Sequence, residues 1–328
     1  MADGSTLYYT RCPAPTATGV GAGLGTLQET LVAQGFQPRA LQDIHDPAIR
    51  RHHFEHGIAN LIREGGNIPA IWAKSGGART RLLGITWLDE IQAVVVRPDS
   101  PARSVADLKG ARFAVPVTPG HRLDVARISA VRGIEQALGT AGLQLSDATL
   151  VDVAHRSTAP GERGGEHFED ELAALATGDV DAVWLKSAAG AAAIASGKVR
   201  PLIRLDLADD PLVRVNNGTP RTLTFHEDFI AEHPDAVGAV LDAVRRAVET
   251  IGPDRHRLWA LLAGETGQSV EDAESAFGGF TTANLLPDLT EERLAALQHQ
   301  ADFLFRHGFA PARVDVREWA LPFPGAGA

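Results

Sequence analysis

The sequence has a single cysteine, Cys12, among its 328 residues. One cysteine excludes an intramolecular disulfide framework. Long apolar runs are also missing, since no stretch approaches the about 20 apolar residues that a membrane-spanning helix needs. The N-terminal segment has an early acid and neither a basic start nor an apolar run, so it does not resemble a secretory signal. We therefore expect a cytoplasmic protein that has no membrane segment.

Positive charge is scarce as well. The chain has 31 Lys and Arg residues against 41 Asp and Glu residues, which gives a formal net charge of -10. Without any basic stretch, this balance excludes a nucleic-acid-binding protein. It does not exclude an anionic ligand, because a local pocket can carry the opposite sign. A hydrophobic fraction of 44% is typical of a globular chain with a core.

Segments typical of strands alternate with segments typical of helices along the chain. The expected strands are 7–9, 39–44, 81–86, 91–96, 112–115, 151–154, 179–185 and 199–205. The expected helices include 18–34, 123–141, 168–176, 234–251, 255–263, 270–276 and 290–307. Further helices are expected after the N-cap Asp46, after Asn67 and at 104–110. Such alternation predicts an α/β fold with parallel sheets, and the length allows two lobes that face each other across a cleft. We expect lobe I to combine 1–97 with 200–328, and lobe II to span 98–199.

The segment 52–66, with sequence HHFEHGIANLIREGG, is the strongest candidate for chemistry. We expect its last part, 60–66, to be irregular and Asn67 to cap the helix that follows. Arg63 with Gly65 and Gly66 would then offer a guanidinium and backbone N–H groups to one anion. Cys12 follows an expected strand, and a nearby histidine could tune its thiol. A second Arg-Gly-Gly, at 163–165, lies in a polar loop and is interpreted as a decoy.

Each of these residues also has a plainer interpretation. Cys12 could be a small buried hydrophobic residue. Arg63 could complement the dipole of a helix end. His52 and His56 have the i, i+4 spacing of zinc ligands, with Glu55 beside them, but a glycine breaks the helix directly afterwards.

Several motifs resemble a known family. The sequence DLKGAR at 107–112 and the sequence LATGDVDA at 175–182 resemble the sulfonate and taurine group of type II periplasmic-binding-protein folds. The resemblance narrows to the hydroxybiphenyl sulfinate desulfinase branch of that family. The pieces that carry it are, in order, 9–15, His53-Phe54, 63–66, Ile68-Pro69, 79–86 and 318–320.

The resemblance implies that Cys12, His53, Arg63 and Gly66 surround a sulfinate, with Gly65 beside them. Cys12, His53 and Arg63 are the implied catalytic residues, and Arg63, Gly65 and Gly66 the implied substrate-binding ones. Thr10, in the same motif as Cys12, joins this substrate-binding set. The implied reaction is hydrolysis of an aryl carbon–sulfur bond with release of sulfite, by a monomer that needs no cofactor or metal. Cys12 would act either as a nucleophile on sulfur or as an acid toward carbon, and both routes stay open. The implied partner is a small anionic organosulfur substrate.

The chain also departs from that branch. Glu55, His56 and Gly57 replace the residues that follow His-Phe there, and the segment 186–189 replaces one rich in tryptophan. With aromatic residues at 6%, the substrate is expected to be a different sulfinate. The alternative function is a solute-binding protein of the ABC-transporter type for a sulfonate or similar anion. A pyrimidine-precursor protein of the same fold would call for several clustered cysteines or an iron site, and the single cysteine argues against this class.

Overall fold

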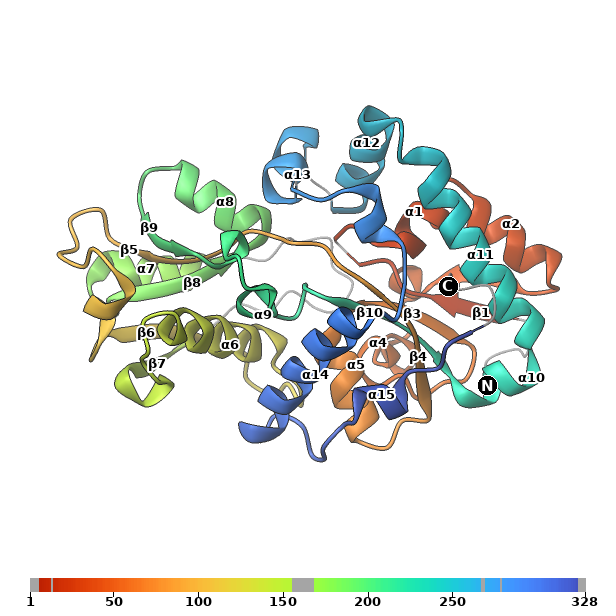
Figure 1. Ribbon diagram of the computed structural model, residues 1–328, viewed down its shortest axis with the longest axis horizontal. Helices are drawn as coiled ribbons and strands as arrows, with labels where there is room; N and C mark the ends of the chain where they lie inside the picture. Colours follow the sequence, from red (N-terminus) through yellow and green to blue (C-terminus); the bar gives the residue numbers. More distant parts are fainter. Residues whose placement is uncertain (1–5, 13, 155–167, 267–268, 278, 324–328) are drawn as a thin grey trace.

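The computed structural model describes residues 6–12, 14–154, 168–266, 269–277 and 279–323. Two five-stranded sheets with helices packed on them form two lobes. In Figure 1 the second sheet lies on the left and the first on the right, with C-terminal helices above and below their junction. The expected α/β architecture with two lobes is therefore confirmed.

The first sheet has the strand order β2-β1-β3-β10-β4. Its strands are β1 (Thr6–Tyr9), β2 (Gln37–Ala40), β3 (Leu61–Gly66), β4 (Thr80–Thr86) and β10 (Arg221–His226). β1 is parallel to β2 and β3, whereas β10 is antiparallel to both β3 and β4. β3 thus lies in the middle of the sheet, with a partner strand on each side.

The second sheet has the strand order β7-β6-β8-β5-β9. Its strands are β5 (Gln92–Val96), β6 (Arg112–Val117), β7 (Thr149–Ala154), β8 (Ala182–Lys186) and β9 (Arg200–Arg204). β6 is parallel to β7 and β8, and β5 is antiparallel to β8 and β9. Both sheets are therefore mixed, and the expectation of purely parallel sheets is wrong.

Helices cover both sheets and the junction between them (Figure 1). They are α1 (Ala17–Gly23), α2 (Thr26–Ala33), α3 (Pro47–Arg50), α4 (His52–Glu55), α5 (Asn67–Ser75), α6 (Val125–Gly139), α7 (Glu169–Thr177), α8 (Ser187–Ala195), α9 (Pro211–Arg214), α10 (Glu227–Glu232), α11 (Pro234–Ile251), α12 (Arg255–Thr266), α13 (Val270–Phe277), α14 (Glu291–Arg306) and α15 (Val316–Trp319). Short 3-10 turns occur at Leu41–Asp43, Val105–Leu108, Leu145–Asp147, Leu205–Leu207 and Thr282–Leu285.

Local signals explain several helix ends. Asp46 accepts a hydrogen bond from the backbone of Ala48 at the start of α3, as an N-cap should. Gly178, with a φ of 82°, ends α7. Gly25, with a φ of 81°, divides the single helix expected at 18–34 into α1 and α2. Along α11, buried residues at helical spacing pack against α1 and α2 and close the core of the first lobe.

Two differences from expectation affect the site. The segment 60–66 is not irregular, because most of it forms the central strand β3. Asn67 is the first residue of α5, and its side chain donates to the carbonyls of Asn216 and Pro220, so it does not cap the helix. β10 was not expected as a strand, although it pairs with both β3 and β4.

The chain crosses between the sheets twice. β4 ends at Thr86 and β5 begins at Gln92, while β9 ends at Arg204 and β10 begins at Arg221. The expected division at 97/98 and 199/200 leaves β5 and β9 outside lobe II, although both strands are part of the second sheet. In the described part of the chain, no helix has the length and apolar character to cross a membrane.

Candidate active site

The predicted site residues meet at the edge of the first sheet that is formed by the C-terminal ends of the parallel strands β1 and β3. β1 and β3 are parallel, so both strands end at this edge, and Cys12 lies just beyond β1. The antiparallel strand β10 begins there, with Arg221 opposite Gly66, the last residue of β3. Three strands therefore bring a thiol, a glycine backbone and two arginine residues to the same end of the sheet.

The Cys12 thiol continues the pairing of β1 with β3. Its Sγ donates to the backbone carbonyl of Glu64 at 3.3 Å, and it accepts a hydrogen bond from the backbone N–H of Gly66. The side chain is 7% exposed. Burial raises the pKa of the Cys12 thiol, while the charges of Arg63 and Arg221 and the Gly66 N–H oppose this rise. The resting group is thus a neutral thiol with cations around it.

Arg63 is completely buried in the middle of the sheet. Its Nε donates to the His53 carbonyl at 2.8 Å, and its Nη2 donates to the Gly66 carbonyl at 3.1 Å. Among the described residues, Nη1 has no hydrogen-bond partner. Burial lowers the pKa of Arg63 to about 10, which still leaves it charged at neutral pH. A buried cation with an uncommitted N–H is suited to bind an anion.

The two glycines are required by close contacts. A Cβ on Gly65 would lie 2.5 Å from Cys12 Sγ and 4.0 Å from Arg63 Nη1. A Cβ on Gly66 would lie 2.5 Å from the side-chain oxygen of Asn217. The thiol and the guanidinium therefore approach each other over Gly65, in space that any larger residue would fill.

His53 is a neutral residue beside Arg63. Burial, together with the charges of Arg63 and Arg50, lowers the pKa of its imidazole to about 3. Its ring meets Phe54 edge to face, with the ring centroids 5.0 Å apart. The role that the structure gives His53 is to hold Arg63 through its backbone carbonyl, and action of the imidazole on Cys12 stays a prediction.

Thr10 ties β1 to β3. Its hydroxyl donates to the Glu64 carbonyl at 2.8 Å and accepts from the Glu64 N–H at 2.9 Å. The residue is only 1% exposed. Thr10 thus fixes the strand that leads to Cys12, and its contact with substrate stays a prediction.

Glu64 has a structural role that the sequence did not indicate. Its carboxylate accepts from the backbone N–H groups of Ala17 and Thr18, at the start of α1, and from the Thr86 hydroxyl. Burial raises the pKa of Glu64, and these hydrogen bonds oppose the rise. In the sequence, Glu64 appears only as a charged residue next to Arg63. That does not tell which way its side chain points or that it binds the start of α1.

The zinc interpretation of the histidines has no support in the described residues, where no three His, Cys, Asp or Glu side chains are grouped to hold a metal. Both ring nitrogens of His56 are engaged, with the Leu61 carbonyl at 3.1 Å and the Thr224 hydroxyl at 3.3 Å. His56 thus links β3 to β10 through its two ring nitrogens. The expected decoy at 163–165 lies outside the described residues.

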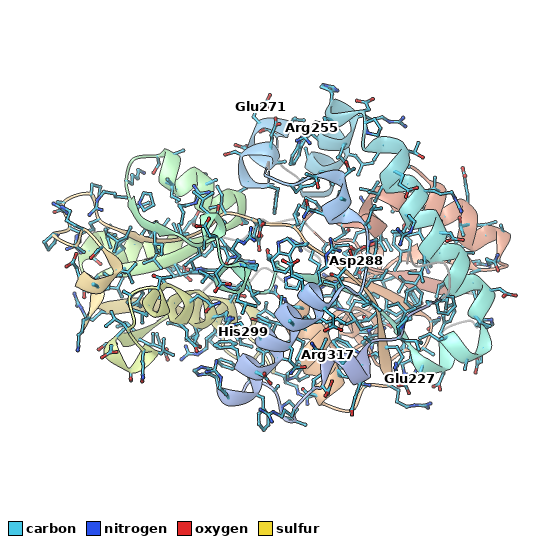
Figure 2. All side chains as sticks on the ribbon, in the orientation of Figure 1. Glu227, Arg255, Glu271, Asp288, His299 and Arg317 are labelled. Carbon is cyan, nitrogen blue, oxygen red and sulfur yellow. The ribbon has the colours of Figure 1, made fainter. Side chains whose placement is uncertain are left out.

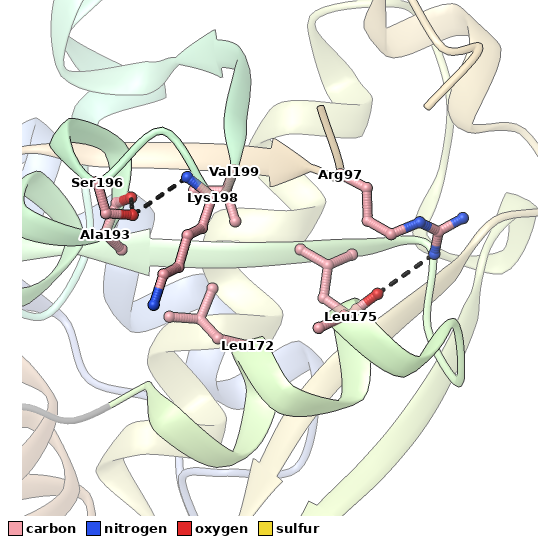
Figure 3. Close-up of a pocket in the computed structure, with 8 residues that line it drawn as sticks. Arg97, Leu172, Leu175, Ala193, Ser196, Lys198 and Val199 are labelled. Atoms are coloured by element: carbon pink, nitrogen blue, oxygen red, sulfur yellow. Dashed lines mark hydrogen bonds between the residues drawn. The ribbon is translucent and has the colours of Figure 1, made fainter. Parts of the chain in front are cut away.

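A pocket in the second lobe contains none of the predicted site residues (Figure 3). It has a volume of about 120 Å³, and Leu172 and Leu175 of α7 face Ala193 and Val199 across it. Arg97 donates to the Leu175 carbonyl at 3.3 Å at its side. This pocket is small and mostly apolar, so it does not compete with Cys12 and Arg63 as the candidate active site.

Comparison with known protein families shows the family of this chain. Residues 71–254, more than half of the sequence, match the family described as NMT1/THI5 like. The chain belongs to this family. The family match covers the whole second sheet but only β4 and β10 of the first, and it begins after Cys12 and Arg63.

Relatives extend the similarity to the whole chain. The chain is 28% identical to a 2'-hydroxybiphenyl-2-sulfinate desulfinase of Rhodococcus erythropolis, over 97% of this chain and 92% of that protein. The desulfurization enzyme DszB with bound biphenyl-2-sulfinic acid is similar in structure, with a TM-score of 0.75, 25% identity and coverage of 97% and 96%. The aliphatic sulphonate binding protein SsuA of Escherichia coli shares the fold, with a TM-score of 0.66, 19% identity and coverage of 99% and 95%. The expected periplasmic-binding-protein-like fold is therefore confirmed, as is the resemblance to the desulfinase branch.

Proposed function

We propose that this protein is a desulfinase, which cleaves the carbon–sulfur bond of an organic sulfinate and releases sulfite. The observation that carries the proposal is the approach of the Cys12 thiol and the uncommitted Arg63 N–H over Gly65. A thiol can supply a proton or a nucleophile, and a guanidinium can hold the sulfinate oxygens. The similarity to a named desulfinase over nearly the whole chain supports the same conclusion.

Cys12 acts in this proposal as a general acid. Its thiol is already a hydrogen-bond donor, and burial raises its pKa, so the proton is present at neutral pH. The thiol proton is transferred to the carbon that bears sulfur, the electron pair of the carbon–sulfur bond stays on that carbon, and sulfur dioxide leaves. Water then adds to sulfur dioxide to give bisulfite and a proton, and that proton restores the thiol. The nucleophilic route would start from a thiolate, which the buried site disfavours.

The anion is held by Arg63, and contacts of the anion with Gly65 and Gly66 stay predictions. Arg63 Nη1 supplies an N–H to one sulfinate oxygen while His53 and Gly66 fix the rest of the guanidinium through their carbonyls. Because acid, anion site and water suffice for the balanced reaction, we propose that it needs no cofactor. The cytoplasmic location and the monomeric state stay predictions.

Sulfite release from benzenesulfinate and biphenyl-2-sulfinate tests the function. Wild type is expected to release sulfite, Cys12→Ser to lose turnover by about 1,000-fold, and sulfinate binding to persist in Cys12→Ser. Mass spectrometry of the quenched enzyme during turnover is expected to show no covalent adduct on Cys12. Saturable binding by both proteins with no sulfite from either would instead identify a solute-binding protein.

A further inference from the structure

Thr222 is a buried threonine of β10 that sequence reasoning did not select. It lies directly opposite Gly65 in the pairing of β10 with β3, and opposite Ile85 in the pairing of β10 with β4. The residue is 0% exposed, and its hydroxyl has no hydrogen-bond partner among the described residues. The side chains across the sheet cannot satisfy it, because Gly65 has none and that of Ile85 is apolar.

Thr222 lies on the face of the sheet that carries the candidate site. Residues directly opposite each other in an antiparallel pair point to the same face, and successive residues of a strand alternate between faces. Thr222 therefore shares a face with Gly65 and Arg63, whereas Glu64 lies on the other face, toward α1. A Cβ on Gly65 would lie 2.5 Å from Cys12 Sγ and 4.0 Å from Arg63 Nη1. The hydroxyl, the thiol and the guanidinium thus border the same space over Gly65.

A second threonine on this face of β10 shows what a structural role looks like. Thr224 lies opposite Arg63, and its hydroxyl contacts His56 Nδ1 at 3.3 Å and the Arg63 carbonyl at 3.3 Å. Thr222 is equally buried and has no such contact among the described residues. The difference is one of position, because Thr222 is two residues closer to the edge of the sheet where Cys12 lies.

The space over Gly65 has the donors that a small anion needs. Cross-strand neighbours have Cβ atoms about 5 Å apart, so a group of a few atoms reaches both Thr222 and the guanidinium of Arg63. A buried hydroxyl or N–H without an acceptor is costly. A sulfinate has two oxygen atoms, and one could accept from Arg63 Nη1 while the other accepts from the Thr222 hydroxyl.

We propose that Thr222 is a substrate-binding residue, whose hydroxyl donates to one oxygen of the anion while Arg63 Nη1 donates to the other. The proposal rests on the proposed function for the identity of the anion, a sulfinate. Donors on two neighbouring strands hold the group in one orientation beside the Cys12 thiol, as a positioned proton transfer requires.

Calorimetric titration with benzenesulfonate, an unreactive sulfonate, tests this role without requiring turnover. Thr222→Val keeps the shape of the side chain and removes the hydroxyl, so affinity is expected to fall by about tenfold or more through loss of a hydrogen bond to a charged group. Thr222→Ser keeps the hydroxyl and should bind within about threefold of wild type. The urea midpoint of Thr222→Val should equal or exceed that of wild type, because the free protein loses no hydrogen bond.

Thr80→Val is the matched control. Thr80 is a buried threonine of β4 that pairs with His226, at the other end of β10 from Thr222, and its hydroxyl accepts from Trp319 Nε1 at 3.2 Å. Loss of this hydroxyl should lower the urea midpoint and leave sulfonate affinity within about twofold of wild type. Affinity and stability are thus expected to change in opposite ways in the two variants.

The outcomes separate this proposal from the proposed function. Sulfonate affinity of Thr222→Val within about twofold of wild type, or an equal loss in Thr80→Val, would overturn the role of Thr222. If Thr222→Val fails to fold, Thr222→Ala and Thr222→Ser give the same comparison, and equal affinities in that pair would overturn it as well. Weaker binding by Thr222→Val, without sulfite release from sulfinates by wild type, would refute the desulfinase and leave the Thr222 site standing. A wild type that binds neither sulfonates nor sulfinates refutes both.

Discussion

Arg63 in β3 and Arg112 in β6 are arginines on strands of the two sheets, and the protein satisfies them very differently. Arg112 is half-exposed and donates to both carboxylate oxygens of Asp181, at 3.0 and 2.9 Å, and to the Gly178 carbonyl. Arg63 is completely buried, binds only carbonyls and retains one unpartnered N–H. Arg112 in the second lobe finds acceptors and a counter-charge within the protein. Arg63 in the first lobe lacks an acceptor for one N–H, and a ligand can supply it.

The same contrast holds for other charged groups. Arg255, Glu271 and Arg317, labelled in Figure 2, are exposed on α12, α13 and α15, and Arg317 pairs with Glu291 at 2.7 Å. Arg127 in the second lobe pairs with Asp152 at 2.7 Å, close to the surface. The edge around Cys12 keeps its charges away from water, so their interactions are less screened and a bound anion is held more strongly.

Among the substitutions that test this difference between the lobes, Gly65→Ala is expected to lower activity the most. The new methyl would occupy the space 2.5 Å from Cys12 Sγ, so it would displace the thiol from Arg63. We expect sulfite release to fall by about 100-fold or more, because such displacements are costly for positioned catalytic groups. Steady-state kinetics measures the change.

The control for this variant is Gly139→Ala at the end of α6 in the second lobe. A Cβ there meets nothing within 4 Å, so activity should be unchanged. Full activity in Gly65→Ala would show that the close approach of thiol and guanidinium is not needed for turnover.

Replacing each arginine separates a ligand site from a structural ion pair. Arg63→Gln removes the guanidinium that faces the anion, and we expect sulfonate binding to weaken by about 30-fold or more. Arg112→Gln removes an exposed pair with Asp181 and a hydrogen bond to the Gly178 carbonyl, both in the second lobe, so binding should remain at the wild-type level. Calorimetric titration of both variants measures the difference, and equal losses in the two would remove the distinction between the lobes.

His56 in the first lobe is expected to make the free energy of unfolding depend on pH, an effect smaller than those of the two substitutions above. Burial, with the Arg63 charge, lowers the pKa of His56 to about 3, so the unfolded chain binds its proton at a higher pH than the folded one. The contribution of His56 is therefore complete above the unfolded pKa and is lost as the pH falls. Between pH 7 and pH 5 this amounts to about 2 kcal/mol of unfolding free energy.

Urea unfolding at pH 7 and pH 5 measures this term. His56→Asn keeps a residue that tolerates the φ of 44° and removes the titration, so the difference between the two pH values should shrink. His121→Asn, at an exposed histidine of the second lobe, is the control substitution. The same pH dependence in wild type and His56→Asn would contradict the assignment.

The sequence predicted much of the fold because local signals coincide with the tertiary structure. The helix expected at 234–251 has the bounds of α11, since a proline starts it and its apolar residues repeat at helical spacing. β10 was missed because its sequence, RTLTFH, is short and mixes polar with apolar residues. β10 is buried between β3 and β4, and even its polar residues Thr222 and Thr224 are inaccessible to solvent. This burial becomes apparent only once the sheet is assembled.

The candidate site divides in the same way. Cys12, Arg63, Gly65 and Gly66 could be selected from residue type and spacing, and the structure brings them together. Thr222 could not, because it is far from them in sequence and faces them only through the pairing of β10 with β3.

The sequence by itself determined the alternation of strands and helices, the single thiol and the arginine followed by two glycines. These depend on residue type and on spacing over a few residues. Only the tertiary structure decided that the Arg63 segment is a central strand, that Glu64 is directed toward α1 and that Thr222 lies opposite Gly65. Those features depend on contacts between residues far apart in the chain, whose free energies are set by burial and pairing and leave no local pattern.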